Sequence, residues 1–350
     1  MLITRDFSRQ HTRGAVRTNG STALTTARTT ALTTALTIGN FDGVHRGHQA
    51  MLALLTSEAK HRGLPATVMT FEPHPRDYFA RRMNRPELAP ARIATLRDKL
   101  AELERCGIDH VVVVRFDESF AAQSPQGFID DVLLRGLGAR YVLVGDDFQF
   151  GAKRAGNYTM LDAAGARQGF DVARMMSYEV HGLRVSSSAV RAALAAGDMA
   201  TATALLGRPY SISGHVVRGR QLGRTLGCRT LNLRFQHPHP AAMGIFVARV
   251  HGLGPEPLPG VASLGVRPTI EGDGQMLLET HCLRWPQGLG MEAGYGRLVR
   301  VELVHKLHDE RKYEGLDALR EGIARDMADA QRWFNLSEPT ALKTTTPDLR

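Results

Sequence analysis

The chain has 350 residues, 43% of them hydrophobic and 23% charged, which is the composition of a globular protein of about two to three domains. No apolar run approaches the roughly 20 residues of a membrane-spanning helix, and three widely separated cysteines indicate a reducing compartment rather than a disulfide framework. A formal charge of +9 points to anionic partners, which could be nucleic acid or small phosphorylated substrates.

The two ends of the chain differ in composition from the rest. Residues 1–33 are rich in threonine, carry arginine and contain almost no acidic residues. Such a composition occurs in organelle transit peptides, but a disordered extension is the simpler interpretation, and residues 337–350 have the composition of a disordered tail.

From residue 34 onward, short apolar segments alternate with segments of helical periodicity. We expect strands at 35–38, 66–71, 110–114 and 141–144. We expect a helix ending near Arg62, a helix over 92–106 with Ile93, Leu96, Leu100 and Leu103 on one face, and a helix over 124–137 with N-cap Ser124 and Pro125 at its first position. This alternation predicts a parallel α/β sheet in a domain over 34–206.

Unusual polar clusters in this half follow the predicted strands. GNFDGVH (39–45), EPHPRD (72–77) and GDDFQFG (145–151) each begin where a strand ends. Because ligands bind outside the carboxyl ends of strands in open α/β sheets, we expect these loops to meet at one crevice.

The pattern changes after residue 206. Six short strand candidates, punctuated by glycine and proline, lie at 211–217, 230–234, 244–250, 261–265, 277–284 and 298–304. They predict an antiparallel barrel. A C-terminal helix follows, with Leu316, Leu319, Ile323, Met327, Ala330 and Phe334 on one face, so the second domain covers 207–336.

His45 and His48 are the most informative residue pair of the first half. They could belong to a metal site, contact a phosphate or simply form a turn. No second group of histidines or cysteines in this half has zinc-ligand spacing, so the metal interpretation is disfavoured. A glycine-containing loop between a strand and a helix favours phosphate.

The string TIGNFDGVHRGHQ resembles the HxGH nucleotidyltransferases, and among them the bacterial bifunctional riboflavin kinase/FAD synthetase family. Further segments extend the resemblance over roughly 34–334: TFEPHPRDYF, VGDDFQFGAKRAGN, VSSSAVRAAL, LLGRPYSISGHVV, GRTLG, GVRPT and DERKY. The resemblance implies a Rossmann-like FMN adenylyltransferase domain followed by a β-barrel riboflavin kinase domain.

For the first domain, the resemblance implies that His45 and His48 stabilise the charge that develops as FMN attacks ATP and pyrophosphate leaves. The implied ATP contacts are Gly39, Asn40, Phe41, Asp42, Gly43, Gly47, Ser187, Ser188 and Arg191. Residues 186–188 could equally cap a helix that begins near Ala189. The implied flavin contacts are Pro73, Pro75 and Asp147, although EPHP could be a rigid connector and Phe148 and Phe150 plain core.

For the second domain, the resemblance implies ATP contacts at Gly219, Gly223, Arg224, Gly227, Thr230 and Asn232, of which Thr230 and Asn232 hold Mg²⁺. Glu279 is the implied general base, although it could be the polar position of an edge strand. His308 and Glu310 are the implied flavin contacts. The chain departs from the family pattern at Arg229, where proline is usual, and at His308, where arginine is usual.

We therefore expect a cytoplasmic enzyme that uses ATP with Mg²⁺ to convert riboflavin to FMN and FMN to FAD. Its partners would be these small molecules, with no nucleic acid and no membrane, and it would be a monomer or weak homo-oligomer. The alternatives are a chain with a weakened kinase half, a nucleotidyltransferase for another phosphorylated substrate, and a basic nucleic-acid-binding protein.

Overall fold

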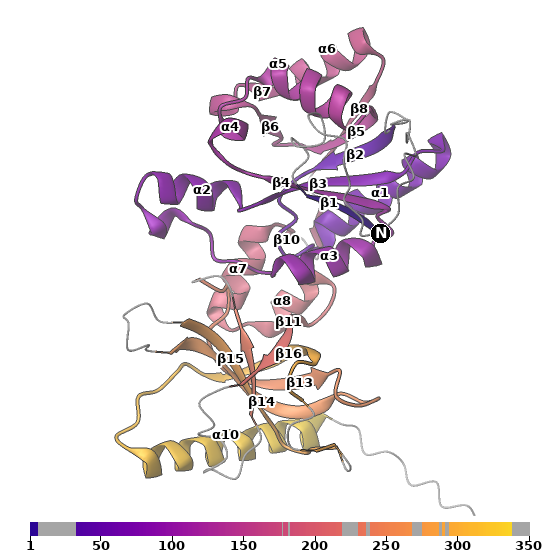
Figure 1. The fold of residues 1–350 in the computed structure, drawn as a ribbon. Helices are drawn as coiled ribbons and strands as arrows, with labels where there is room; N and C mark the ends of the chain where they lie inside the picture. Colours follow the sequence, from indigo (N-terminus) through magenta and orange to yellow (C-terminus); the bar gives the residue numbers. More distant parts are fainter. Residues whose placement is uncertain are drawn as a thin grey trace, which may run out of the picture. The chain divides into compact units, whose positions relative to one another are not determined.

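A computed structural model describes residues 1–5, 33–176, 178–180, 183–218, 230–235, 239–267, 275–286, 289–290 and 294–337. The chain forms two units, one from Met1–Pro90 with Leu96–Ser187 and the other from Ala91–Thr95 with Ser188–Arg350 (Figure 1). Helices α7 (Ser187–Ala196) and α8 (Met199–Leu206) therefore lie largely in the second unit, ahead of the boundary predicted at 206/207. The reason is visible in the packing, because α8 contacts two barrel strands.

The first unit is built on a six-stranded parallel sheet in the order β1–β4–β3–β2–β5–β8. The strands are β1 (Leu2–Arg5), β2 (Thr34–Ile38), β3 (Ala66–Glu72), β4 (His110–Arg115), β5 (Ala139–Gly145) and β8 (Asp171–Met175). The four predicted strands are confirmed as β2, β3, β4 and β5. All four are short runs of buried residues, as expected for strands covered on both faces.

The prediction of a disordered extension over 1–33 is wrong for residues 2–5. These residues form β1, which pairs in parallel with β4 at the edge of the sheet. Leu2 is 61% exposed and Ile3 is 43% exposed, so the strand has no buried run that would predict it. The prediction for residues 6–32 lies outside the described residues.

Helices cover both faces of this sheet (Figure 1). On one face, α1 (Arg46–Arg62) and α3 (Leu96–Arg105) pack in a core with Ala35, Val68 and Val111. On the other face, the π-helix η3 (Phe128–Gly136) and α6 (Tyr158–Gln168) enclose Leu36 and Val142.

Two of the predicted helices form with different boundaries. Ser124 caps α5 (Pro125–Gly127), which runs on into η3, and its side chain accepts from the Gly127 N–H as predicted. Ile93 is buried as predicted but does not lie on the helix, because α3 begins at Leu96 and residues 91–95 belong to the second unit.

Shorter elements complete the first unit. They are α2 (Pro75–Arg82), η2 (Pro86–Leu88), α4 (Glu118–Ala121), β6 (Gln149–Phe150), η4 (Ala152–Arg154), β7 (Gly156–Asn157), β9 (Glu179–Val180) and β10 (Leu183–Arg184).

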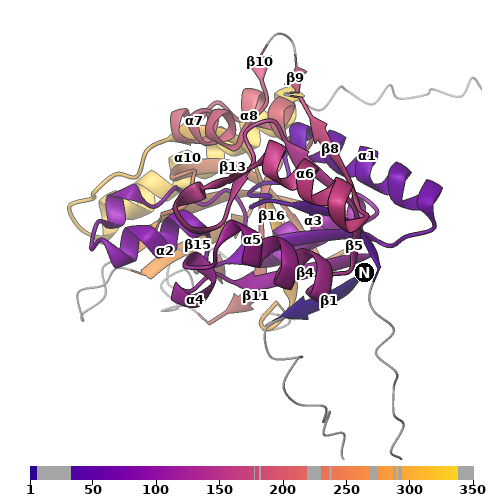
Figure 2. The same cartoon turned by 90° about the horizontal axis from the view of Figure 1, so that it is seen from above.

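The second unit is a closed six-stranded barrel in the order β11–β12–β15–β14–β13–β16. The strands are β11 (Tyr210–Val217), β12 (Thr230–Arg234), β13 (Gly244–His251), β14 (Leu258–Arg267), β15 (Gln275–Cys282) and β16 (Leu298–His308), which confirms the six predicted strands and their antiparallel pairing. The predicted C-terminal helix is α10 (Leu316–Ser337), which packs against β13 and β14 through Val247, Val261, Ala330 and Phe334 (Figures 1 and 2).

Residues 91–95 join this second unit by backbone pairing. The Arg92 N–H donates to the His239 carbonyl at 2.8 Å, and the Ala241 N–H donates to the Arg92 carbonyl at 3.0 Å. Arg92 is 2% exposed. In the described part of the chain, none of the helices has the length and apolar character to cross a membrane.

Candidate functional sites

The loop of residues 39–45 leaves the carboxyl end of β2, where the order of the sheet reverses. From β2 the chain adds β3 and then β4 on one side, and later adds β5 and β8 on the other. Such a switch point is where open α/β sheets bind ligands. The loop ends at α1, a 17-residue helix whose first turn contains no acidic residue, so its N-terminus is suited to an anion.

His45 and His48 are packed against each other at the start of α1. His45 is the N-cap, and its Nδ1 accepts from the His48 backbone N–H at 3.3 Å. Their rings stack with centroids 3.6 Å apart and planes 15° apart, and the ring of Phe41 lies 5.0 Å from that of His48. Because Nδ1 of His45 accepts a hydrogen bond, the proton of the neutral ring is on Nε2, which can donate to a phosphate oxygen.

Gly47 is tightly packed against this histidine pair. A Cβ at position 47 would lie 3.3 Å from the His45 ring and 3.3 Å from the Val185 carbonyl oxygen. The missing side chain makes room for His45 itself, so Gly47 serves the histidine pair as well as any approach of a nucleotide.

The backbone of the loop adopts a conformation that side chains disfavour. Phe41 has φ 48°, Gly43 has φ 83° and Val44 has φ 41°. Positive φ is an outlier for a β-branched residue such as Val44 and costs about 1–3 kcal/mol per site. Such a conformation persists only where the surrounding contacts hold it.

Five of the predicted ATP contacts, residues 39–43, lie in this loop, and Gly39, Asn40 and Asp42 have the following surroundings. Gly39 continues the β2–β3 pairing through its N–H and the Met69 carbonyl at 3.1 Å. Asp42 is 1% exposed. Among the described residues, the buried Oδ1 of Asn40 has no hydrogen-bond partner, so it is an acceptor suited to a ligand.

The three predicted ATP contacts on α7 have different surroundings. Ser187 Oγ donates to the Asp42 carbonyl at 3.2 Å, which brings Ser187 to the loop. Arg191 Nε donates instead to the Ala91 carbonyl at 2.6 Å, within the second unit, to which Ser188 also belongs. The helix begins at Ser187 rather than near Ala189, so Ser187 and Ser188 form its first turn.

Two of the predicted flavin contacts in this half, Pro73 and Pro75, lie between Phe71 and Tyr78 in the chain, which belong to a group of aromatic side chains. Pro73 follows a cis peptide bond, and Pro75 is the first residue of α2, capped by the His74 side chain. Asp147 is exposed after β5, whereas Phe148 and Phe150 pack with the core as the alternative reading expected. The rings of Phe71, Tyr78, Phe79, Phe116 and Phe120 contact one another at centroid distances of 5.2–5.8 Å.

Sequence reasoning missed this aromatic group. Its members come from β3, α2 and the segment after β4, so they are distant in the sequence and meet only in the fold. A usable signal was present, because the aromatic residues follow two neighbouring strands at their carboxyl ends.

In the barrel, the strand register aligns three polar residues in one row. Asn232 on β12 is paired with Glu279 on β15, and Glu279 is paired with Ser263 on β14. Cross-strand partners point to the same face of a sheet, so the predicted metal ligand and the predicted base are direct neighbours. Because β15 is bonded on both sides, the alternative reading of Glu279 as an edge-strand residue is wrong.

Asn232 fits the role of an Mg²⁺ ligand. It is 6% exposed, and its buried Oδ1 has no hydrogen-bond partner among the described residues. Thr230 Oγ1 lies 3.3 Å from Nδ1 of His281. Amide and hydroxyl oxygens are ligands that hard divalent cations prefer.

His308 is the last residue of β16 and Glu310 follows the strand, and the two have different partners. Ser263 Oγ donates to Glu310 Oε1 at 3.3 Å, so Glu310 borders the row of Asn232, Glu279 and Ser263. The His308 ring contacts α10, because its Nε2 lies 2.8 Å from Asp326 Oδ1. Its Nδ1 lies 2.7 Å from the Asp309 carbonyl, so both ring nitrogens have a partner. The predicted contacts Gly219, Gly223, Arg224 and Gly227, and the departure at Arg229, lie outside the described residues.

Comparison with known proteins matches each half to a separate family. A family model described as FAD synthetase matches residues 27–189, and one described as riboflavin kinase matches residues 206–334. A "Bifunctional riboflavin kinase/FMN adenylyltransferase" from Escherichia coli K12 is 46% identical and the match covers 86% of this chain and 93% of the relative. Proteins of the same description from Haemophilus influenzae and Pseudomonas fluorescens are each 42% identical, covering 85% and 87% of this chain and 93% of each relative.

One solved structure has a similar fold over nearly its whole length. It is titled "Crystal Structure of Macrolide-efflux Protein from Streptococcus pneumoniae", with a TM-score of 0.67 and 25% identity over 86% of this chain and 95% of that one.

Proposed function

The chain belongs to the bifunctional riboflavin kinase/FMN adenylyltransferase family, so it phosphorylates riboflavin to FMN and adenylylates FMN to FAD, and from this premise we propose where each reaction occurs and which residues perform it. Adenylyl transfer takes place in the first unit, at the loop of residues 39–45 and the start of α1. Phosphoryl transfer takes place on the barrel, at the row formed by Asn232, Glu279 and Ser263.

In adenylyl transfer, a phosphate oxygen of FMN attacks the α-phosphorus of ATP, and the bond to pyrophosphate breaks. The protein aligns the two anions and stabilises the charge that develops on pyrophosphate. His45 and His48 donate to phosphate oxygens, aided by the N-terminus of α1. The observation that carries this assignment is the hydrogen bond from the His48 N–H to His45 Nδ1, which leaves Nε2 of His45 as a donor.

Within the first unit, ATP is held by the loop residues 39–43 together with Gly47 and Ser187. Ser188 and Arg191, which belong to the second unit, remain predicted ATP contacts. The buried, unsatisfied Oδ1 of Asn40 and the hydrogen bond between Ser187 and Asp42 support this placement for Asn40 and Ser187. The flavin ring lies by Pro73, Pro75 and Asp147. The aromatic group supports this placement at Pro73 and Pro75, because flat rings stack on aromatic faces.

In phosphoryl transfer, the 5′-hydroxyl of riboflavin attacks the γ-phosphorus of ATP, ADP leaves, and Glu279 accepts the hydroxyl proton. Thr230 and Asn232 hold Mg²⁺, as their oxygen ligands and the buried Oδ1 of Asn232 support. When bound, Mg²⁺ neutralises charge on the ATP phosphates. Glu310 contacts the flavin, and His308 acts chiefly by holding α10. The remaining ATP contacts are Gly219, Gly223, Arg224 and Gly227.

We infer a cytoplasmic enzyme whose partners are small molecules and which works as a monomer or weak homo-oligomer. Cys106 and Cys282 are free thiols, which supports a reducing compartment.

Matched variants test whether the two reactions occur at separate sites. The protein is incubated with riboflavin, ATP and Mg²⁺, and FMN and FAD are separated by chromatography. His48→Ala is expected to abolish FAD formation and leave FMN formation intact. If both activities fall together in a folded variant, the assignment of two separate sites is wrong.

The reciprocal variant is Glu279→Gln, which keeps the shape of the side chain and removes the base. It is expected to suppress FMN formation and leave FAD formation from supplied FMN intact. Unchanged FMN formation would exclude Glu279 as the base. Chelation of Mg²⁺ with EDTA is expected to stop FMN formation, with restoration by added Mg²⁺.

A further inference from the structure

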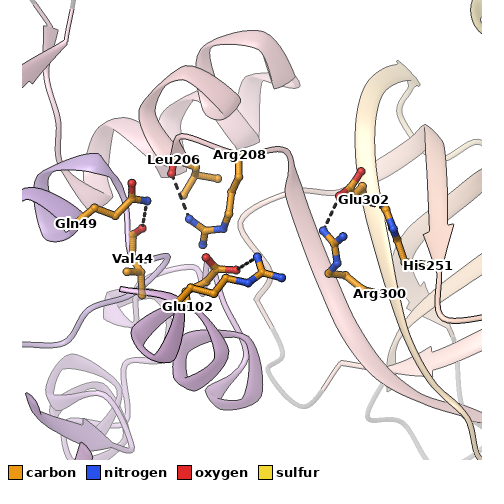
Figure 3. Close-up of polar contacts among 9 residues, drawn as sticks. Val44, Gln49, Glu102, Leu206, Arg208, His251, Arg300 and Glu302 are labelled. Atoms are coloured by element: carbon orange, nitrogen blue, oxygen red, sulfur yellow. Dashed lines mark hydrogen bonds and ion pairs between the residues drawn. The ribbon is translucent and has the colours of Figure 1, made fainter. Parts of the chain in front are cut away.

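Three carbonyl oxygens of the loop at residues 39–45 accept hydrogen bonds from side chains outside it. Thr70 Oγ1 donates to the Asn40 carbonyl at 3.2 Å, and Ser187 Oγ donates to the Asp42 carbonyl. Gln49 Nε2 donates to the Val44 carbonyl at 2.8 Å, a contact that Figure 3 shows. These tethers lie on either side of Phe41 and at Val44, the two non-glycine residues of this loop with positive φ. The strained backbone is therefore held at alternate residues.

Thr70, which forms the tether at Asn40, also accepts a hydrogen bond. Lys99 on α3 is 1% exposed, and its Nζ donates to Thr70 Oγ1 at 3.3 Å. An ammonium group has only donors, so the Thr70 hydroxyl accepts from Lys99 and its own proton is left for the Asn40 carbonyl. Lys99 thus fixes the direction of the hydroxyl at the point where the loop leaves β2.

The tether at Val44 lies beside the reacting histidines. Gln49 follows His48 on α1, and it reaches back to the residue that precedes His45. It therefore closes a short ring of chain that contains both histidines and Gly47. A change in Val44 would move the N-cap residue that follows it.

We propose that Thr70, oriented by Lys99, and Gln49 are positioning residues for adenylyl transfer. They touch the loop rather than the reacting atoms, and they hold its backbone in the conformation that receives the ATP phosphates. The inference rests on the proposed site at His45 and His48. It extends the machinery to residues on β3 and α3 that are far from the HxGH motif in sequence.

The test measures kcat and KM for ATP in FAD formation from supplied FMN. Thr70→Val and Gln49→Met remove a donor at similar size, and each is expected to raise KM for ATP about fivefold, the effect of losing one ordinary hydrogen bond. The kcat value is expected to change less than KM, and riboflavin kinase activity in the same molecules to stay unchanged.

Matched variants separate positioning from general destabilisation. Thr70→Ser keeps the hydroxyl and is expected to retain the normal KM. Gln126→Met removes an exposed glutamine of the same unit that donates to Asp130, and it is expected to leave KM for ATP unchanged. Because Thr70 is fully buried and Gln49 is half-buried, Gln49→Met decides the question if Thr70→Val does not fold.

Two results would overturn the inference. One is an unchanged KM for ATP in folded Thr70→Val and Gln49→Met proteins, and the other is an equal defect in Thr70→Ser and Thr70→Val. If His48→Ala still forms FAD, the proposed site itself is wrong. If His48→Ala is inactive and the tether variants are normal, only the positioning role is wrong.

Discussion

Gly47→Ala is the most sensitive probe of the histidine pair. In a helix, alanine is favoured over glycine by about 1 kcal/mol, so the substitution by itself should stabilise α1. The new Cβ would lie 3.3 Å from Cε1 and Nδ1 of His45 and 3.3 Å from the Val185 carbonyl oxygen, which requires the neighbours to yield by a few tenths of an ångström. The histidine ring yields more easily than the backbone carbonyl.

Such a shift moves His45 against His48, whose ring is stacked on it at 3.6 Å. Since a misplacement of about 1 Å costs about a hundredfold in rate, we expect kcat for FAD formation to fall about tenfold. Because the tight contact of the new Cβ opposes the gain in helix propensity, the thermal unfolding midpoint should be unchanged, and so should FMN formation. Ser57→Ala on the exposed face of α1 is the control, because it gains helix propensity without a new contact. A normal kcat in Gly47→Ala would show that the stacked geometry is not required.

Three further predictions concern the barrel. Gly265→Ala would place a Cβ where the Glu310 carboxylate now lies, so KM for riboflavin should rise about fivefold, and an unchanged KM would argue against Glu310 as a flavin contact. His308→Ala would leave Asp326, which is 9% exposed, without this partner and would lower the free energy of unfolding by about 1–3 kcal/mol. In His308→Gln the side chain can still donate to Asp326, so equal melting curves for the two variants would contradict the stabilising role of His308. Burial raises the pKa of the Cys282 thiol to about 12, above the 9.0 of an exposed thiol, so its contribution to stability is full below pH 9 and is lost as the pH rises toward 12. Native protein should resist alkylation at Cys282 at pH 8, as mass spectrometry would show, and rapid labelling would contradict the burial.

The elements that could be predicted from sequence are those with a one-dimensional pattern. Strands β2 to β5 are short buried runs, and the barrel strands are marked by glycine and proline between them. By contrast, β1 and β8 are only partly buried and carry no such run. Ile93 fits the helical period of α3 but lies outside it, because pairing of Arg92 with residues 239 and 241 draws this segment into the barrel unit.

The site was predictable only where a motif carried it. The HxGH motif identified His45 and His48. It did not indicate that His45 would cap the helix that contains His48. The hydrogen bond of Ser187 to Asp42 joins residues 145 apart, and no local pattern announces such a contact. Likewise, the pairing of Asn232 with Glu279 depends on the register of β12 against β15, which a shift of one residue would abolish.

The pairing of residues 91–95 with the barrel unit determines how the enzyme can be divided. The chain passes between its two units at 90/91, 95/96 and 187/188, so no single cut yields two complete halves. A fragment ending at residue 206 would carry Arg92 without the backbone partners His239 and Ala241, and the complementary fragment would lose both α7 and α8. A fragment that carries only one of the two activities therefore requires redesign of the segment at residues 91–95. Cutting the chain at a single linker is not sufficient.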